Sequence, residues 1–327
     1  MTIVSASAVR SWLPGKSAFA NYISAWAKLQ FGLVRSFRMI GVEAFGLVGL
    51  PISWTRAHRI CVLMLAPAST VLCSLAAMGQ TSDPVSIETL AKTAENPISE
   101  VISVASQNAI VPNTEPYRQS SFALDIQPVV PFHLSPDWNL VTRTTIPTLA
   151  QVRLSPEQGR SFGIGDINQI FAFTPAHPGP LIWGAGPVLS YPTASASGFG
   201  SGKWNAGPTL VALVMPGDWV IGALAHNMWS FAGATDRDRV NLLTLEPFVY
   251  YNFPDGSYIT SNPTITANWI AKGRERWTVP FGGGVGRFFT VQGQAIDAQI
   301  GVYYNSMRPS SASEWQFRFD VSYIFPK

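Results

Sequence analysis

The chain ends in WQFRFDVSYIFPK, residues 315–327, in which apolar and polar side chains alternate. Successive side chains of a β-strand point to opposite faces, so this segment predicts a strand with one aromatic face and one polar face. The odd-numbered positions, which form the aromatic face, are Trp315, Phe317, Phe319, Val321, Tyr323 and Phe325. Ile324 is the exception on the polar parity. Such a strand fits either between a protein core and water, or between lipid and a wet lumen.

The same alternation extends upstream as far as Val101. The predicted strands are 101–111, 123–132, 138–147, 163–173, 181–191, 204–214, 219–229, 240–253, 258–269, 277–289, 295–305 and 315–325. Short connections such as MPGD and PDGS alternate with longer ones such as TASASGFGSGK. Short turns at one end and longer loops at the other are typical of outer-membrane barrels, which contain an even number of strands. The sequence therefore predicts an all-β fold, a transmembrane antiparallel up-and-down β-barrel of about 12 strands over residues 101–327.

Composition separates this fold from a secreted β-sandwich, the main alternative. Charged residues make up only 13% of the chain and aromatic residues 12%, whereas about 25% of residues are charged in ordinary soluble proteins. A soluble sandwich with so many aromatic strands would expose large apolar areas. Residues 1–80 hold seven Lys and Arg but a single acid, Glu43, whereas the remainder holds 15 Lys and Arg and 18 Asp and Glu and is therefore slightly acidic. The chain therefore offers no basic surface that would indicate a nucleic-acid partner.

The segment before the strands is predicted to be a leader. Residues 60–79 form an apolar run that contains both cysteines, Cys61 and Cys73, with basic residues before it and small residues at its end. This is the pattern of a secretory signal peptide, with cleavage expected after Ala76 or Gly79. A single membrane-anchor helix is the alternative, because the run is about long enough to span. Removal of the leader would leave a mature chain without cysteine.

Residues 1–55 are mixed basic and apolar, and no fold is predicted for them. A long leader or a start codon assigned too far upstream, with Met39 as the true start, accounts for them. Residues 1–79 are therefore interpreted as leader and signal peptide. Residues 80–100 follow as a periplasmic plug or linker, in which Ser86 caps a short helix and Pro97 ends it.

Several segments resemble a known family. They are ENPISEVISV, LDIQPVVPFHLSPDWNLVTRTTIP, WGAGPVLSYPT, GSGKWNAGPT, WSFAG, NPTITANW, WTVPFGGGVG and the terminal IFPK. These are similar to the bacterial proteins grouped as the MetA-pathway of phenol degradation family, many of which are labelled "neuromedin U". The resemblance covers residues 86–327. That family is similar to the twelve-stranded channel that exports functional amyloid, whose periplasmic helix acts as a plug. The resemblance implies a transport barrel with a plug near residues 87–97, but names no cargo.

Catalytic chemistry finds little support in the sequence. His133 and Ser135 are close enough to suggest a hydrolase pair, but they fall in a predicted short turn before Pro136. The segment PFGGGVGR, residues 280–287, lacks the helix and the Lys-Ser/Thr pair of a phosphate loop. Its glycines are interpreted as sites of tight strand curvature or of close approach by a plug or a neighbouring strand. We therefore expect no enzyme activity, cofactor or metal site.

Charged side chains within the predicted strands are the candidate functional residues. Charge on a lipid face costs about 2–4 kcal/mol at the midplane, so these residues are expected to line the lumen. They are Asp125, Arg143, Asp166, Glu246, Asp297, Arg318 and Asp320. They would either select the solutes that pass or brace the lumen by pairing with each other.

The sequence thus predicts a channel or transporter in the outer membrane of a Gram-negative bacterium. Its cargo would be small hydrophobic or aromatic solutes, or an exported polypeptide. A non-transport barrel, either a surface enzyme or a structural or adhesion protein, is the alternative. The expected partners are outer-membrane lipid and the barrel-assembly machinery, which would bind the C-terminal strand Trp315–Phe325. A homotrimer is compatible with the sequence, and no nucleic-acid partner is expected.

Overall fold

The computed structural model describes residues 87–325, except for residues 115–118 and 152–160. The leader and signal peptide predicted over residues 1–79 lie outside the described residues. Within these ranges, one α-helix, α3 (Ile87–Glu95), precedes the strands, and one 3₁₀ helix, η2 (Gly273–Arg276), lies among them. No helix of the described part is long and apolar enough to cross a membrane.

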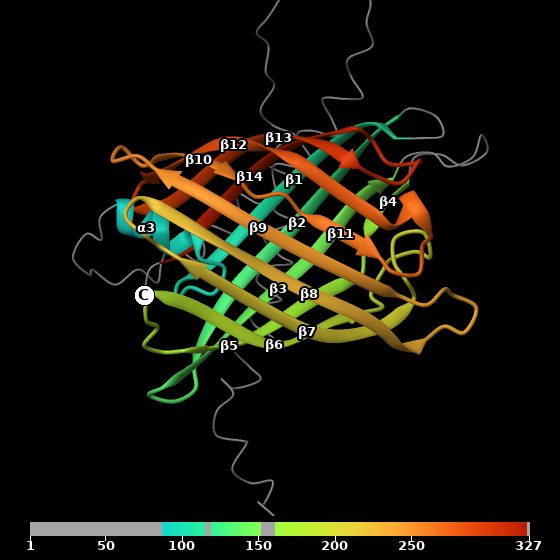
Figure 1. Cartoon of the computed structure of the whole chain (residues 1–327), viewed down its shortest axis with the longest axis horizontal. Coiled ribbons are helices and arrows are strands. Elements are labelled where there is room, and N and C mark those ends of the chain that lie inside the picture. Colours follow the sequence, from blue (N-terminus) through green and yellow to red (C-terminus); the bar gives the residue numbers. More distant parts are fainter. Residues whose placement is uncertain (1–86, 115–118, 152–160, 326–327) are drawn as a thin grey trace, which may run out of the picture. The chain divides into compact units, whose positions relative to one another are not determined.

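The strands follow in order along the chain (Figure 1). They are β1 (Ile102–Thr114), β2 (Gln119–His133), β3 (Trp138–Gln151), β4 (Ser161–Ile164), β5 (Ile167–Pro175), β6 (Leu181–Tyr191), β7 (Lys203–Val214), β8 (Trp219–Gly233), β9 (Asn241–Asn252), β10 (Ser257–Ser261), β11 (Ile265–Asn268), β12 (Trp277–Val291), β13 (Gln294–Met307) and β14 (Trp315–Phe325). All the pairings are antiparallel, and consecutive strands pair with each other except β4 with β5 and β10 with β11.

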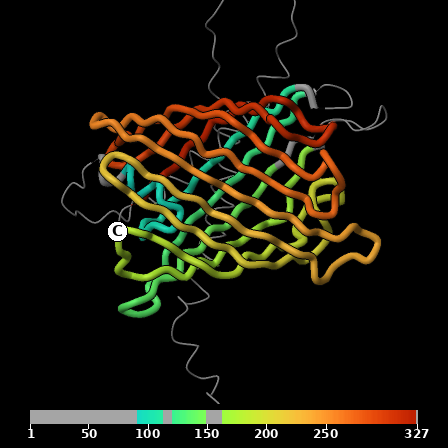
Figure 2. Tube along the Cα trace, in the orientation of Figure 1, coloured from blue at the N-terminus to red at the C-terminus, as the bar shows by residue number. Residues whose placement is uncertain are grey.

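These segments close into a barrel. β1 pairs with β14 from Ile102↔Phe325 to Ile110↔Phe317, so the first and last strands meet along a continuous seam. Figure 2 shows the blue-green start of the barrel beside its red end. The segments β4 and β5 both pair with β3, and β10 and β11 both pair with β9 and β12. Each of these two sets is one strand with a break, so the described residues form a barrel of twelve strands, as the sequence predicted.

Both breaks interrupt strands that the sequence predicted as continuous. The first falls at Gly165 and Asp166, between β4 and β5. The second falls at residues 262–264, between β10 and β11, where Pro263 has no N–H to donate to a ladder. A break of this kind re-aims side chains locally, and Asn262 is turned toward the interior as a result.

The two ends of the barrel differ in the length of their connections. The turns β2–β3, β5–β6, β7–β8, β9–β10 and β12–β13 are short, and we call this the short-turn end. The opposite end holds the longer connections, apart from the four-residue connection 115–118 between β1 and β2, and is the long-loop end. Figure 1 places α3 at the short-turn end.

The outer face of the barrel is apolar. On β14, Trp315, Phe317 and Phe319 are 44–45% exposed, whereas the side chains of Arg318 and Asp320 on the opposite parity are only 12% and 10% exposed. The same division repeats on β13, where Ile300, Val302 and Tyr304 are exposed outside and Gln299, Tyr303 and Asn305 are buried inside. A closed barrel with this surface satisfies all of its ladder bonds internally, as a membrane requires.

Aromatic side chains form a belt at each end of this surface. At the short-turn end, Trp138 contacts Trp183 edge to face, and Trp219 packs against Tyr251 at 4.8 Å between ring centroids. The long-loop end has the pairs Tyr191–Trp204, Trp269–Trp277 and Tyr304–Trp315. Tyr and Trp concentrate at the two membrane–water interfaces because their rings are apolar and their tips are polar. The aromatic parity of the C-terminal strand therefore lies on the outer face of the barrel.

Candidate functional site: the bridged lumen and its helix

An ion pair crosses the interior of the barrel. Arg143 on β3 bonds through Nη1 to Oε2 of Glu246 on β9, at 2.9 Å. The strands β5, β6, β7 and β8 lie between them along the wall, so the bond spans the lumen instead of following a ladder. Arg143 Nε also donates to Gln127 Oε1 on β2 at 3.1 Å, and Gln127 Nε2 donates to Gln107 Oε1 on β1 at 2.9 Å. A continuous chain of polar side chains therefore connects β9 to β1.

A second arginine crosses in another direction. Arg318 on β14 donates from Nη1 to the backbone oxygen of Asn262 at 2.8 Å, past the intervening strands β13 and β12. Its Nη2 pairs with Asp320 Oδ2 at 3.2 Å, and its guanidinium lies 5.3 Å from the ring centroid of Tyr303. The guanidinium groups of Arg143 and Arg318 therefore each connect two separate parts of the barrel wall across the lumen.

Asn262 organises the polar wall opposite Arg318. Its Oδ1 accepts from Tyr303 Oη at 2.5 Å and from Gln299 Nε2 at 3.3 Å, while its Nδ2 donates to Tyr250 Oη at 3.1 Å. The break before Pro263 is what frees this residue from the ladder. It was not among the residues predicted from charge, although an Asn-Pro pair inside a predicted strand is a recognisable signal of a break.

The remaining predicted carboxylates occupy three different settings. Asp297 on β13 accepts a 2.8 Å hydrogen bond from Tyr258 Oη. Asp125 on β2 lies within electrostatic range of Arg143 and Arg318. Asp166, in contrast, sits in the break between β4 and β5 and holds the β6–β7 connection.

The contacts of Asp166 are those of a structural brace. Its Oδ2 accepts from the backbone N of Ser201 at 2.6 Å and from its hydroxyl at 2.8 Å, and its Oδ1 accepts from the backbone N of Ala194 at 3.2 Å. Arg237 holds the same connection from the β8–β9 loop by donating to the carbonyls of Ser197, Gly200 and Ser201. The structure thus places Asp166 apart from the crossing charges.

One wall of the lumen is apolar. Inward-facing side chains of β3 to β9 form a buried cluster with Ile98, which precedes β1. Its strand members are Val141, Ile170, Ala172, Val188, Val211, Leu213, Val220, Leu224, Met228 and Phe248. His226 lies beside this wall, in electrostatic range of Glu246, and its buried Nδ1 has no hydrogen-bond partner in the described part of the chain. The lumen is thus amphipathic, with aliphatic residues on one side and charged and phenolic groups on the other.

Helix α3 docks on the inner wall at the short-turn end. Ala91 is 1% exposed and forms a buried cluster with Tyr258, Phe288, Ala295 and Ile324. Ile324 is the residue that broke the alternation of the last strand. It faces inward, is fully buried, and belongs to the same apolar cluster as Ala91 of the helix.

A strand glycine makes room for this docking surface. Tyr258 on β10 is paired in register with Gly286 on β12, and a Cβ at Gly286 would lie 2.2 Å from its phenol ring. The ring therefore lies flat across β12 to reach Asp297 on β13. This is the close approach predicted for the glycines of PFGGGVGR, here made by a neighbouring strand.

A buried carboxyl fixes the end of the helix. Glu95 is 8% exposed, and its Oε2 accepts from Asn252 Nδ2 on β9 at 2.9 Å. Burial raises the pKa of Glu95 to about 8, and the neighbouring Asp297 adds to the rise, while Asn252 and Lys92 oppose it. The sequence identified the helix but not these partners, because period-two alternation does not reveal which strands meet a separate segment.

The segment after α3 is held at the same rim. Asn139 on β3 donates to Glu100 Oε1 at 2.6 Å, and its Oδ1 lies 2.8 Å from His133 Nδ1. Ser135 instead accepts from the backbone N–H groups of Asp137 and Trp138 within the β2–β3 turn. Ser135 thus lies in the predicted turn, whereas His133 is the last residue of β2 and has a different partner, Asn139.

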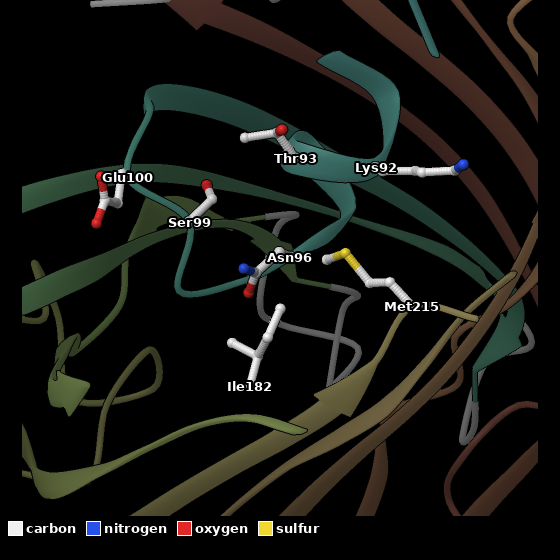
Figure 3. A pocket seen from close by; sticks show the side chains of 7 residues that line it. All are labelled: Lys92, Thr93, Asn96, Ser99, Glu100, Ile182 and Met215. Carbon is white, nitrogen blue, oxygen red and sulfur yellow. The ribbon is translucent and has the colours of Figure 1, made fainter. Parts of the chain in front are cut away.

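A cavity of about 370 Å³ remains between this segment and the barrel wall. Figure 3 shows Ile182 and Met215 on the strand side, facing the residues of α3 and of the segment that follows it. The lining residues are Lys92, Thr93, Asn96, Ser99, Glu100, Ile182 and Met215. Within the described ranges, no group of three or more His, Cys, Asp or Glu side chains is placed to hold a metal ion.

Comparison with solved structures finds a protein of similar fold, whereas the comparisons with family models and with curated proteins find none. No family model matches the chain, and no curated protein matches it significantly. An outer membrane channel from Pseudomonas putida F1 is similar in structure, with a TM-score of 0.52, 14% identity, and coverage of 69% of this chain and 94% of that one.

Two further solved barrels are more distant. The NanC porin has a TM-score of 0.44 and 9% identity, and covers 68% of this chain and 98% of its own. The outer membrane phospholipase A of Escherichia coli has a TM-score of 0.37 and 12% identity, and covers 75% of this chain and 99% of its own. At these identities the likeness to the Pseudomonas channel shows the fold alone. The chain has the fold of an outer-membrane β-barrel.

Proposed function

We propose that this protein is a gated channel of the outer membrane of a Gram-negative bacterium, with α3 as its plug. The observation that carries the proposal is the docking of α3 inside the short-turn end of a barrel whose lumen is lined with charged groups. A segment outside the strand ladder can leave without breaking the barrel. The fold of the Pseudomonas channel and the sequence resemblance to the MetA-pathway family support the same function.

The lumen favours small solutes over a polypeptide. The Arg143–Glu246 bond and the contact of Arg318 with Asn262 cross the interior at two places. An amphipathic passage, aliphatic on one side and polar on the other, matches a small molecule with an apolar body and a polar group. Such a solute replaces few lumen contacts at a time, whereas an extended chain would have to break both crossings at once.

Conductance in planar bilayers tests this function. The purified mature protein, which is expected to change its gel mobility on boiling, should show discrete channel openings. A filled interior also suits a barrel with a surface function, the second candidate, because both apolar clusters are closely packed. Such a barrel would show no openings, either as the whole protein or after removal of α3, and that result would replace the channel proposal.

The short-turn end is proposed to face the periplasm, since short turns are periplasmic in known barrels. We expect an epitope tag after Ser311, an exposed residue of the long β13–β14 connection, to bind antibody on intact cells. A tag after Gly179, an exposed residue of the short β5–β6 turn with open space around it, should bind only after the outer membrane is permeabilised. Labelling in the opposite order would show that the barrel is inserted the other way.

The partners follow from the surfaces of the barrel. The exposed aliphatic and aromatic side chains of the outer face are proposed to contact membrane lipid. The C-terminal strand Trp315–Phe325, with its aromatic outer face, is proposed as the segment bound by the barrel-assembly machinery. Neither proposal depends on whether the barrel works alone or as a trimer.

A further inference from the structure

The contact between Glu95 and Asn252 is incomplete as a carboxylate–amide pair. Glu95 Oε2 accepts from Asn252 Nδ2 at 2.9 Å. The other two oxygens, Glu95 Oε1 and Asn252 Oδ1, are both buried and have no hydrogen-bond partner in the described part of the chain. Two acceptors cannot bond to each other, so an ionised Glu95 leaves both of them unsatisfied.

One proton on Glu95 would satisfy both oxygens. A protonated carboxyl has one O–H donor and keeps acceptor capacity on its other oxygen. With the O–H on Oε1, Glu95 can donate to Asn252 Oδ1 while Oε2 still accepts from Nδ2. A buried unsatisfied group costs about 1–3 kcal/mol, and more when it is charged, so the neutral pair is the favoured docked form.

The surroundings of Glu95 also disfavour its charged form. Asp297 faces it from β13, and the phenols of Tyr250 and Tyr258 face it from β9 and β10. The cluster members on β12 and β14 are the apolar Phe288 and Ile324. Among the described residues, the cation whose charge acts on Glu95 is Lys92 on α3 itself, which leaves the lumen with the helix and therefore belongs to the moving part.

We propose that the docking of α3 is proton-coupled: Glu95 binds a proton from water when the helix enters the barrel and returns it to water when the helix leaves, so that alkaline conditions open the channel. This inference rests on the proposed plug function. It adds a chemical signal, proton concentration on the side of the short turns, that sets the position of the plug.

The direction of the pH response follows from linkage. The pKa of Glu95 is about 8 in the docked helix, against 4.5 for an ordinary glutamate. Docking is therefore strongest below pH 4.5, weakens as pH rises between 4.5 and 8, and levels off above 8. Within that window one proton is linked to docking, so the docking equilibrium constant falls by about tenfold per pH unit.

The test compares single-channel open probability from pH 5 to pH 9 in three full-length proteins. The unmodified protein should be mostly closed at pH 5, with an open probability that rises by about tenfold per pH unit until most channels are open. Glu95→Gln should stay closed throughout, because its amide donates to Asn252 Oδ1 and accepts from Nδ2 at every pH. Asp255→Asn is the matched control at the same rim, because Asp255 is exposed and bonds to Ser257 of its own turn. It should keep the pH response.

A titration that does not involve conductance provides the second readout. In protein labelled with ¹³C at the glutamate carboxyls, the resonance lost in Glu95→Gln should titrate near pH 8. A pH response that survives in Glu95→Gln but disappears in Asp297→Asn would overturn the assignment to Glu95. An open probability that does not vary with pH in the unmodified protein, while removal of α3 still opens the channel, would overturn the proton switch alone. No opening after removal of α3 would overturn the plug itself.

Discussion

Deleting Ser86–Pro97 should raise the conductance several-fold and leave the barrel folded. The deletion removes Ala91 from the cluster with Tyr258 and Ile324, and it removes Glu95 from Asn252. The short-turn mouth would then open onto the polar wall of the lumen. Stability should hardly change, because the β1–β14 seam and the rest of the ladder close without the helix. Planar-bilayer recording measures the first effect, and the gel-mobility shift on boiling measures the second.

A matched variant separates a plug from a spacer. Replacing residues 86–97 with a flexible Gly/Ser segment of equal length preserves the distance to β1 but removes the docked side chains. Both variants should conduct alike if α3 blocks the mouth. A folded deletion variant with unaltered conductance would mean that the segment is only a linker, and the gating proposal would then be wrong.

Arg143→Met is expected to destabilise the barrel by about 2–4 kcal/mol, because Glu246 is left in the interior without its counterion. The side chain of Glu246 is 26% exposed and that of Arg143 13%, which places the cost at or below the range for fully buried pairs. The double variant Arg143→Met/Glu246→Leu should recover most of the loss, since an apolar pair needs no partner. Unfolding in urea, followed by tryptophan fluorescence in detergent micelles, measures the difference.

The same variant should alter conduction. Removing Arg143 takes away the bond that crosses the lumen and leaves carboxylates in excess, so conductance and cation preference should both rise.

Arg308→Met is the control for the stability measurement, because Arg308 and Glu314 pair at the long-loop end, where Glu314 is 56% exposed. An exposed pair of this kind contributes roughly 0–1 kcal/mol. If Arg143→Met and Arg308→Met lower the free energy of unfolding by equally small amounts, the Arg143–Glu246 bond does not brace the barrel.

Strand faces could be predicted from the sequence because alternation in a β-strand is a local property. Trp315, Phe317 and Arg318 needed only their own parity to be assigned to lipid or lumen. The number of strands followed from the alternating connection lengths and is confirmed, although the predicted long loop between β1 and β2 shortens to residues 115–118. Closure between β1 and β14 then followed from the even count.

Partners across the lumen could not be predicted in this way. The alternation predicts that Arg143 and Glu246 face inward. Whether they form a bond also depends on the position of each residue along the barrel axis and of its strand around the wall. The two strand breaks add to this difficulty, because they turn Asn262 inward and move Asp166 away from the crossing charges. The exception at Ile324 had a cause that only the docked helix reveals.

The seam between β1 and β14 has a consequence for biogenesis. Residues 102–110 of β1 cannot form their hydrogen bonds with β14 until residues 317–325 have been synthesised and exported. Until then β1 presents an open edge, which invites pairing with another chain. Closure over so long a sequence separation is slow, because chain entropy is lost before the contacts form. Removal of the last strand would therefore leave a persistent open sheet, not a smaller barrel.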